Sequence, residues 1–479
     1  MKRYNQFLRV GIPVCLLYLS LLSCKKFVEA DPPANRLIAQ SVFNNDVTAM
    51  SVMTGVYQDM TFNLSQFASG ERSLSVLCGL SADELTNFIT TTAVRNEFYT
   101  NSINPNNTYN QSGLWLKLYN VIFTTNAVYE GVTQSTTLTP SLKTQLQGEA
   151  KFIRAFCYFY LTNLYGAVPL ALTTDYVQNA DLPRSNQNLI YDQIEADLIQ
   201  AKTLLADDYI TPKMVATTER VRPIKATASA LLARVYLFRS KFADAERESS
   251  SVIENSRFSL VNLSQAFLAN NAESIWQAQS TRNNGTNPMN TIDGRFFILL
   301  APPSNNNPVH ASSHLLSAFE PNDARKANWI GIYNGLSFPN KYKVATSTTL
   351  TENLVVFRLA EQYLIRAEAR NMQNKITGPN SAASDLNVVR ARAGLSGTAS
   401  INQSEMAAAI LKERQVELFC EWGHRWFDLK RLNLANTVMP SVTSAKGGVW
   451  SSTAQLFPIP QTEILKRPNI YTQNPGYPN

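Results

Sequence analysis

Three stretches of the chain repeat one short pattern, in which a small residue is followed three positions later by a tyrosine and a large apolar residue. A small residue lets two helices approach closely where they cross, and the tyrosine fills the space beside it. Two of the copies are followed by a second helical stretch that opens with alanines, Ala243 and Ala245 or Ala382 and Ala383. This arrangement predicts tetratricopeptide-like helical hairpins, which bury their apolar faces only by stacking on one another. The copies are Ala155-x-x-Tyr158-Phe159, Ala233-x-x-Tyr236-Leu237 and Ala360-x-x-Tyr363-Leu364.

Apolar periodicity and helix-breaking residues give the approximate bounds of these helices. Residues 148–166 predict one helix that Gly166 and Pro169 end, and residues 225–255 predict two helices joined at Ser240-Lys241. Residues 358–395 predict a second pair. A fourth copy of the pattern is predicted at 114–132, with Trp115, Tyr119 and Ala127. The spacing between copies is irregular, so we expect a superhelical scaffold (about 114–166, 225–255 and 358–431) rather than a regular array.

Two long segments between the helical blocks have a different composition. Residues 61–112 and 262–350 are rich in Asn, Ser, Thr, Gly and Pro, with scattered aromatic residues. Long segments of this kind inside a large domain are usually functional loops when they are ordered. The predicted fold class is therefore mainly α, with a loop-rich and less regular ligand-binding half packed on the scaffold. The C-terminal thirty residues contain too much Pro and Gly for a long helix and are expected to form an ordered extended tail.

The N-terminus reads as a secretory signal. Basic residues lead into an apolar stretch, residues 10–23, that is too short to span a bilayer and is followed by Cys24. The tetrapeptide Leu21-Leu22-Ser23-Cys24 is similar to the bacterial lipobox, where the leader is cut before a cysteine that carries lipid. We therefore expect residues 1–23 to be removed and Cys24 to be lipidated; the alternative is a plain signal peptide with an incidental Cys24. Several acyl chains on one residue make a stable anchor.

The remaining composition excludes several classes of function. The formal charge is +7, with 16% charged residues and no long run of like charges, so nucleic acid is not an expected partner. No later apolar run is long enough to cross a bilayer, which predicts a soluble body held by its tether. Cys78, Cys157 and Cys420 are isolated, and we expect buried free thiols rather than a disulfide framework or a zinc site.

Several stretches together resemble the SusD-like (SusD/RagB) family of outer-membrane nutrient-binding lipoproteins of Bacteroidetes. The resemblance implies one SusD-like domain over residues 24–479, exposed at the cell surface. It further implies a protein that captures glycans, or sometimes peptides, beside a TonB-dependent outer-membrane transporter. The stretches are LLSCKKFVEADPP, LSADE (80–84), LWLKLYNVIFTTNA (114–127), GEAKFIRAFCYFYLTNLYGAVPL (148–170), RPIKATASALLARVYLF (222–238), RLAEQYLIRAEA (358–369), DLNVVRARAGL (385–395), ERQVELFCEWGHRWFDLKR (413–431), LFPIP and QNPGY.

The stretch 413–431 is the strongest candidate for chemistry within the scaffold. Read as one helix, it places Glu413, Glu417, Glu421 and Arg425 four residues apart, with Glu421 before Arg425 in the favourable order for an ion pair. The alternative is a glycosidase acid and nucleophile, which needs two carboxyl groups in unequal surroundings. A regular stripe beside arginine gives both glutamates similar surroundings, so we expect a scaffold helix and no catalysis.

Other catalytic or metal-binding patterns receive little support. His424 has no serine or cysteine partner that the sequence can assign. His310 and His314 form an H-x-x-x-H pair without the glutamate of the metalloprotease motif and without a third ligand at a suitable spacing. No phosphate-binding or nucleophile-elbow motif occurs. We therefore expect no metal, no cofactor and no enzymatic activity.

Two groups of loop residues combine aromatic rings, which stack on the apolar face of a pyranose, with planar polar groups that bond its hydroxyls. The first is Asp83, Arg95, Asn96, Tyr99 and Asn101, with Phe98 between them; Asp83 has the alternative role of a helix cap or structural hydrogen-bonding group. The second contains Trp329 and Tyr333, with further rings and amides at Phe296, Phe297, Asn328, Asn334 and Phe338. Trp115, Trp276, Trp422 and Trp426 lie in scaffold-like patterns and are expected in the core.

The predicted function is a tethered protein that binds glycans or oligosaccharides and delivers them to a transporter. Peptide or glycopeptide capture on the same scaffold is one alternative. The alternatives from other classes are a secreted glycoside hydrolase, using Glu417 and Glu421 or another carboxylate pair, and a tetratricopeptide adaptor that binds only protein.

Overall fold

A computed structural model describes residues 42–61, 66–279, 290–347 and 349–478. The predicted signal peptide and Cys24 lie outside the described residues. Among the residues that are described, no helix combines the length and the apolar character needed to cross a membrane.

The first part of the helical scaffold is built around one long buried helix. Helix α7 (Pro140–Tyr165) packs between α6 (Leu116–Gln134) and α9 (Gln187–Leu204), and α3 (Asp46–Thr61) packs across α6 and α7. Proline at the first position of α7 suits a helix start, and Gly166, at φ +73°, ends it. Nearly every residue of α7 from residue 148 onwards is buried, and its charged residues Glu149, Lys151 and Arg154 are buried in ion pairs.

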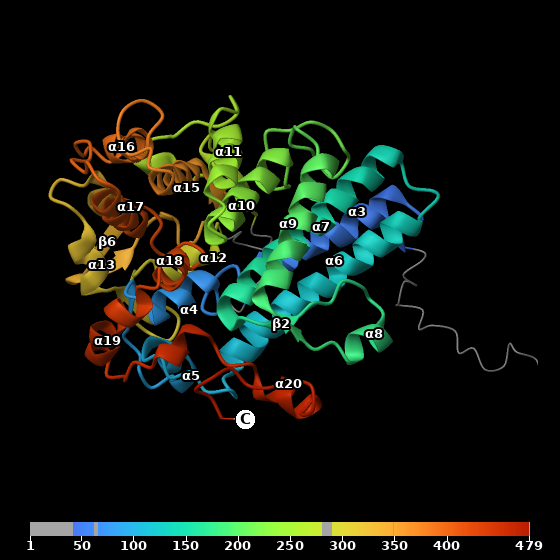
Figure 1. Ribbon diagram of the computed structural model, residues 1–479, viewed down its shortest axis with the longest axis horizontal. Helices are drawn as coiled ribbons and strands as arrows, with labels where there is room; N and C mark the ends of the chain where they lie inside the picture. Colours follow the sequence, from blue (N-terminus) through green and yellow to red (C-terminus); the bar gives the residue numbers. More distant parts are fainter. Residues whose placement is uncertain (1–41, 62–65, 280–289, 348, 479) are drawn as a thin grey trace, which may run out of the picture.

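The second part continues this stacking toward the C-terminus. Figure 1 shows the helices following one another across the upper part of the molecule. Helix α10 packs against α9, α11 against α10 and α15, and α15 against α16 and α17. These helices are α10 (Lys225–Phe238), α11 (Phe242–Ile253), α15 (Leu359–Met372), α16 (Ala382–Arg392) and α17 (Gln403–Glu417).

The predicted hairpins are confirmed. The joint between α10 and α11 falls at Ser240, whose backbone adopts the left-handed conformation (φ +58°). The small residues of the repeated pattern, Ala155, Ala233 and Ala360, are fully buried. The fourth copy is also helical as α6, and a π-helical turn at Tyr109–Trp115 leads into it.

The loop-rich half and the connections outside the long scaffold helices form short helices and two-stranded sheets. Strand β1 (Leu85–Asn87) pairs with β5 (Val309–Ala311), β2 (Val168–Pro169) with β3 (Arg184–Ser185), β4 (Ser274–Ala278) with β8 (Leu354–Arg358), and β6 (Ile330–Tyr333) with β7 (Leu336–Pro339), all antiparallel. The short helices are α4 (Leu74–Ser81), α5 (Ala93–Tyr99), α8 (Tyr176–Ala180), α12 (Ile292–Phe297), α13 (Ser313–Ala318), α14 (Ala324–Trp329), α18 (His424–Arg431), α19 (Ala435–Ala445) and α20 (Gln461–Lys466).

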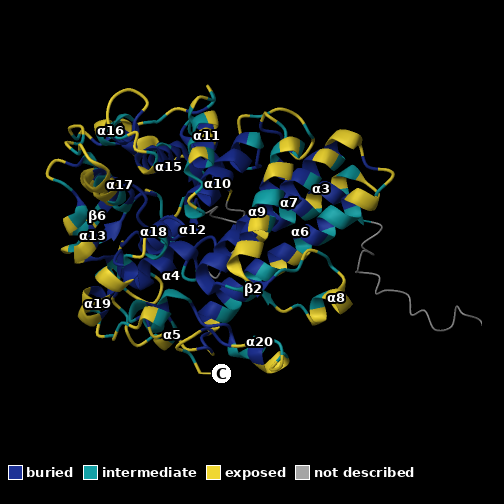
Figure 2. Cartoon of the chain, viewed as in Figure 1, coloured by how far each residue is buried: buried dark blue, intermediate teal, exposed yellow. Residues whose placement is uncertain are grey.

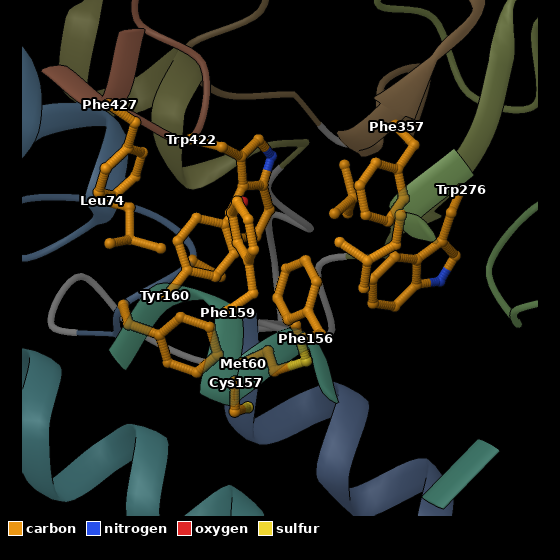
Figure 3. Packing of buried hydrophobic residues seen from close by; sticks show 14 of the residues in the cluster. Met60, Leu74, Phe156, Cys157, Phe159, Tyr160, Trp276, Phe357, Trp422 and Phe427 are labelled. Carbon is orange, nitrogen blue, oxygen red and sulfur yellow. The ribbon is translucent and has the colours of Figure 1, made fainter. Parts of the chain in front are cut away.

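An aromatic core joins the two halves. Figure 3 shows Phe156 of α7 between Trp276 and Phe357 on one side and Trp422 on the other, with Tyr160 of the same helix near Trp422 and Phe427. The Phe156 ring lies 5.5 Å from Trp276 and 5.4 Å from Trp422, both edge to face. Figure 2 shows that burial is continuous through the middle of the molecule. The predicted core role of Trp276 and Trp422 is confirmed, as is that of Trp115 and Trp426.

Other core predictions are also confirmed. Cys78, Cys157 and Cys420 are buried free thiols. The C-terminal tail is ordered against the body, because Phe457 and Ile459 are fully buried and the Asn110 side chain donates to the Pro458 carbonyl at 2.8 Å.

The prediction of one continuous helix through residues 413–431 is wrong. Helix α17 ends at Glu417, and the chain turns through Cys420, Trp422 and Gly423, all with positive φ, before α18 begins at His424. A Cβ on Gly423 would lie 2.9 Å from the Cys78 Cβ, so the turn sits against α4 with no space for a side chain. The turn also removes the helical spacing on which the predicted Glu421–Arg425 pair depended.

Candidate functional site

The glutamates of the 413–421 stretch lie in a buried cluster of ion pairs, which we call the charged centre: Glu413, Glu417, Glu421, Glu273, Arg325, Arg358, Arg392 and Lys341. Glu417 is fully buried and accepts from Arg358 Nη1 at 2.5 Å, from Arg325 Nη1 at 2.9 Å and from Arg392. Arg358 bonds both oxygens of Glu421, each at 2.8 Å, and Lys341 contacts the same carboxylate. Arginines from three separate segments therefore surround the glutamates.

The electrostatics of the charged centre favour a structural role. Burial alone would raise the pKa of Glu417, but the guanidinium groups of Arg392, Arg358 and Arg325 outweigh it and hold that pKa well below its ordinary value. Burial likewise opposes ionisation of Glu421, and Arg358 with Lys341 still lowers its pKa. A glycosidase pair needs one carboxyl that keeps its proton near neutral pH beside one that does not. Glu417 and Glu421, the pair considered for a hydrolase, both have lowered pKa values and do not meet that requirement, whereas burial raises the pKa of Glu413.

Four residues of the predicted ligand groups are buried and bonded within the protein. Asp83 is buried and forms a two-point ion pair with Arg425 (2.8 and 2.7 Å), which realises its alternative structural role. Arg95 is buried against Glu71 and Asn87, and the Asn101 amide donates to the Ser81 carbonyl and to Thr443. The Trp329 ring has no exposed surface, and its Nε1 donates to the Leu263 carbonyl at 3.0 Å. In this conformation none of these side chains presents a free face to a sugar.

The other three predicted residues remain candidates for ligand contact. Asn96 is partly exposed and its Oδ1 accepts from Asn87 Nδ2 at 3.1 Å. Tyr99 is partly exposed, and the Lys446 amine lies 5.2 Å from its ring centre. Tyr333 is partly exposed at the end of β6. Their role in binding stays a prediction.

The structure brings the two predicted groups close through strand β5. Strand β1 leads toward α5, which carries most of the first group, and β1 pairs with β5. Strand β5 also packs against β7, and β7 pairs with β6, which carries Tyr333 of the second group. Along β1, Leu85 and Asn87 are buried, so Thr86 and Phe88 point to the other side. We group the exposed and partly exposed residues of these segments under the name strand face; its members are Thr86, Phe88, Asn96, Tyr99, His310 and Tyr333.

Phe88 and His310 are the members that the sequence reasoning missed. The Phe88 side chain is 49% exposed, and its ring meets the His310 imidazole edge to face at 6.3 Å. Register places His310 opposite Thr86, so the two side chains emerge together beside Phe88. No local signal in the sequence indicates Phe88, because residues 85–88 read apolar, polar, polar and apolar and do not alternate as a half-buried strand does.

The two histidines of the H-x-x-x-H pair lie in different elements. His310 lies on β5 and His314 in α13, so they do not share a helix face. Among the described residues, no three His, Cys, Asp or Glu side chains gather in a way that could hold a metal ion.

Comparison with known families covers most of the chain. Residues 271–477 match the model of the SusD family, and residues 40–237 match a model described as "Starch-binding associating with outer membrane". SusD-like protein P2 of Formosa agariphila is 25% identical over the full length of both chains. SusD-like protein P25 of the same organism is 26% identical over 96% of this chain and 98% of its own.

Solved structures show the same fold. A SusD superfamily protein from Bacteroides vulgatus superposes with a TM-score of 0.77 at 20% identity, covering 90% of this chain and 99% of its own. A laminarin binding SusD-like protein gives 0.74 at 23% identity, covering 91% and 100%. Surface glycan-binding protein A from Bacteroides fluxus gives 0.74 at 21% identity, covering 90% and 100%. With two family models matching the two halves in order and relatives aligning from end to end, the chain belongs to the SusD family.

Proposed function

We propose that the protein captures a glycan on its strand face without hydrolysing it, and passes it to a TonB-dependent outer-membrane transporter. The observation that carries the proposal is the exposed Phe88 ring beside His310 and Thr86. An aromatic ring supplies an apolar surface for a pyranose, and hydroxyl, imidazole and amide groups around it bond the sugar hydroxyls. The names of two structural neighbours, one laminarin binding and one surface glycan-binding, support this ligand class.

In this proposal the mature protein is a single domain, residues 24–479, which a lipid on Cys24 anchors to the outer membrane. A family description that mentions association with the outer membrane supports this location. Tethering beside a transporter raises the effective concentration of captured ligand, so a modest affinity for the glycan is sufficient. The ion-paired glutamates support capture rather than hydrolysis.

Affinity electrophoresis tests the binding step. The mature protein is run through gels that contain laminarin, starch or other neutral polysaccharides, and the supernatants are assayed for new reducing ends. We expect at least one polysaccharide to retard the protein with no release of reducing ends. Phe88→Ala should lose most of the retardation, by about tenfold or more in affinity, which corresponds to about 1.4 kcal/mol.

A matched control guards against general surface effects. Tyr176, on α8, is an exposed ring (83%) away from the strand face, so Tyr176→Ala should migrate as the wild type does. Retardation that is unchanged in Phe88→Ala would refute the strand face as the binding surface.

The tether is tested separately with labelled fatty acid in the native host. We expect label in the wild-type protein and none in Cys24→Ala. Label in both proteins, or in neither, would contradict the lipid anchor and would leave the assignment of the binding surface untouched.

A further inference from the structure

A groove of about 280 Å³ lies between α6, the segment 169–182 and the region of α20. Tyr119 and Phe123 of α6 are one helical turn apart and line it together. Phe123 is 55% exposed, which is unusual for a large ring inside a concave surface. In Figure 1 this region occupies the right-hand and lower part of the molecule, whereas β6 of the strand face lies at the left.

One wall of the groove is held rigidly to α6. The Tyr119 hydroxyl donates to the Pro169 carbonyl at 2.8 Å, and the Asn126 amide donates to the Ala171 carbonyl at 3.1 Å. Further along, Glu130 accepts from the Thr174 backbone amide at 2.9 Å. These bonds link the wall to α6 at three positions spread over about three helical turns, so the shape of the groove exists before any ligand arrives.

The same wall carries a polar atom that the protein leaves unused. Asn179 donates through Nδ2 to the Thr173 carbonyl at 2.7 Å, while its Oδ1 is buried with no hydrogen-bond partner among the described residues. A buried acceptor without a partner is costly, by about 1–3 kcal/mol. Because this oxygen has no exposed surface, it belongs to the interior of the wall and is not counted among the groups that contact a ligand.

The opposite wall carries planar charged groups of both signs. Glu463 and Arg467 are four residues apart and both line the groove. The Arg467 guanidinium bonds the Tyr471 hydroxyl at 2.6 Å through Nη1 and lies over that ring, which fixes its plane. Asn120 of α6 lines the groove with an exposed side chain. Carboxylate, guanidinium and amide groups can each bond two neighbouring hydroxyls.

We propose that this groove is a second carbohydrate-binding subsite, which takes a neutral pyranose unit against Phe123. The ring supplies the stacking surface, and Asn120, Glu463 and Arg467 supply bonds to hydroxyls. Because Glu463 and Arg467 carry opposite charges, the groove favours a neutral ligand over an anionic one. Its volume is at the lower end of the range for ligand pockets, so it accommodates a short stretch of glycan. The site shares with the proposed function only the class of ligand, because it uses none of the residues of the strand face.

The test uses the Phe88→Ala protein, in which the strand face is disabled. A panel of neutral oligosaccharides that includes maltoheptaose and laminarihexaose is titrated into it by calorimetry. We expect a member of the panel to bind, and adding Phe123→Ala to weaken that binding about tenfold or more. Asn120→Ala should weaken it about threefold or more. Both side chains are exposed, so neither variant is expected to unfold, and thermal melting checks this.

Controls separate the groove from its alternatives. Tyr176→Ala, an exposed ring outside the residues that line the groove, should bind within about twofold of its parent. The proposal is overturned if no neutral oligosaccharide binds the Phe88→Ala protein, or if binding survives Phe123→Ala unchanged. It is also overturned if an oligogalacturonate or an unstructured peptide binds the groove more tightly than every neutral sugar. If Phe88→Ala leaves all binding intact while Phe123→Ala removes it, the groove stands and the strand-face proposal fails.

Discussion

The charged centre and the strand face are both built from strands, short helices and loops, but they differ in how far their side chains are buried. In the charged centre, Glu417 and Arg358 are buried, and each has several partners of opposite charge. On the strand face, Phe88 keeps half of its ring exposed although its neighbours Leu85 and Asn87 are buried. The first region satisfies its polar groups internally, while the second retains surface that only another molecule can cover.

This difference separates residues that hold the fold from residues that are free to bind. Arg358 sits at the end of β8, Arg392 at the end of α16 and Arg325 in α14, and all three converge on Glu417 at the end of α17. The charged centre therefore fixes the loop-rich half against the scaffold. If the comparison is correct, changes in the charged centre should alter stability, and changes on the strand face should alter binding.

The largest effect is expected from Glu417→Gln. The substitution leaves guanidinium groups buried without their shared carboxylate, and breaking one partner of a buried ion-pair network costs about 3–5 kcal/mol. Urea unfolding would measure it as a lowered midpoint. Asp207→Asn is the matched control, because its pair with Lys225 is exposed and should contribute about 0–1 kcal/mol. If the two variants lost the same free energy of unfolding, the stabilising role assigned to the charged centre would be wrong.

Trp329→Ala should destabilise the protein by about 3–5 kcal/mol through the cavity it leaves. The ring is fully buried, 5.7 Å from Phe267, and the Lys341 amine lies 4.9 Å from its centre. Below the melting temperature, the folded fraction should still bind glycan with its normal affinity. If Trp329→Ala had normal stability but reduced glycan affinity, Trp329 would be a ligand-binding residue and not a core residue.

Asp293 is a carboxyl in the loop-rich half that, among the described residues, forms no ion pair. Burial raises its pKa to about 7, although its Oδ1 accepts from the Gly70 amide at 2.9 Å. Because the folded-state pKa lies above the unfolded one, Asp293 lowers stability as pH rises from about 4 to about 7. Relative to the wild type, Asp293→Asn should therefore gain stability over this window, by about 2–4 kcal/mol at pH 8. Chemical denaturation at pH 5 and pH 8 measures the gain, and a difference that does not change with pH would contradict it.

The smallest effect is expected from Tyr333→Ala. The ring is partly exposed and packs against the small apolar cluster of Ile298, Leu299 and Phe338, so its removal should cost little stability, about 1 kcal/mol or less. Glycan affinity should fall about threefold, measured by the same gel retardation as for Phe88→Ala. If Tyr333→Ala left the glycan affinity unchanged, the binding surface would be limited to β1, α5 and β5.

The scaffold could be predicted from the sequence because its signals are local. Ala233 and Tyr236, or Ala360 and Tyr363, lie within one turn of each other, and Ser240 falls at the joint between two apolar patterns. The break after Glu417 was not predictable in the same way. Cys420 and Trp422 adopt positive φ although neither favours it locally, and the cause is tertiary packing against α4.

The candidate site was only partly predictable because its contacts are long-range. Asp83 and Arg425 are 342 positions apart, and no local pattern links them. Composition identified segments rich in rings and amides but did not indicate which rings point outward, so the buried Trp329 was assigned to the ligand surface and the exposed Phe88 was not assigned at all. The Asn334-Gly335 pair, with both residues at positive φ, is a local signal for the β6–β7 hairpin that the composition of this segment concealed.

Hydrogen–deuterium exchange, with and without a polysaccharide that retards the protein, tests the central claim most directly. We predict slower exchange of the bound protein at residues 85–99 and 330–339, unchanged exchange at 403–431, and no cleavage of the glycan. Slower exchange at 115–126 would report on the groove separately. Protection centred on residues 413–421 together with release of reducing ends would contradict the account, because the charged centre would then be the place where the ligand is bound and cut.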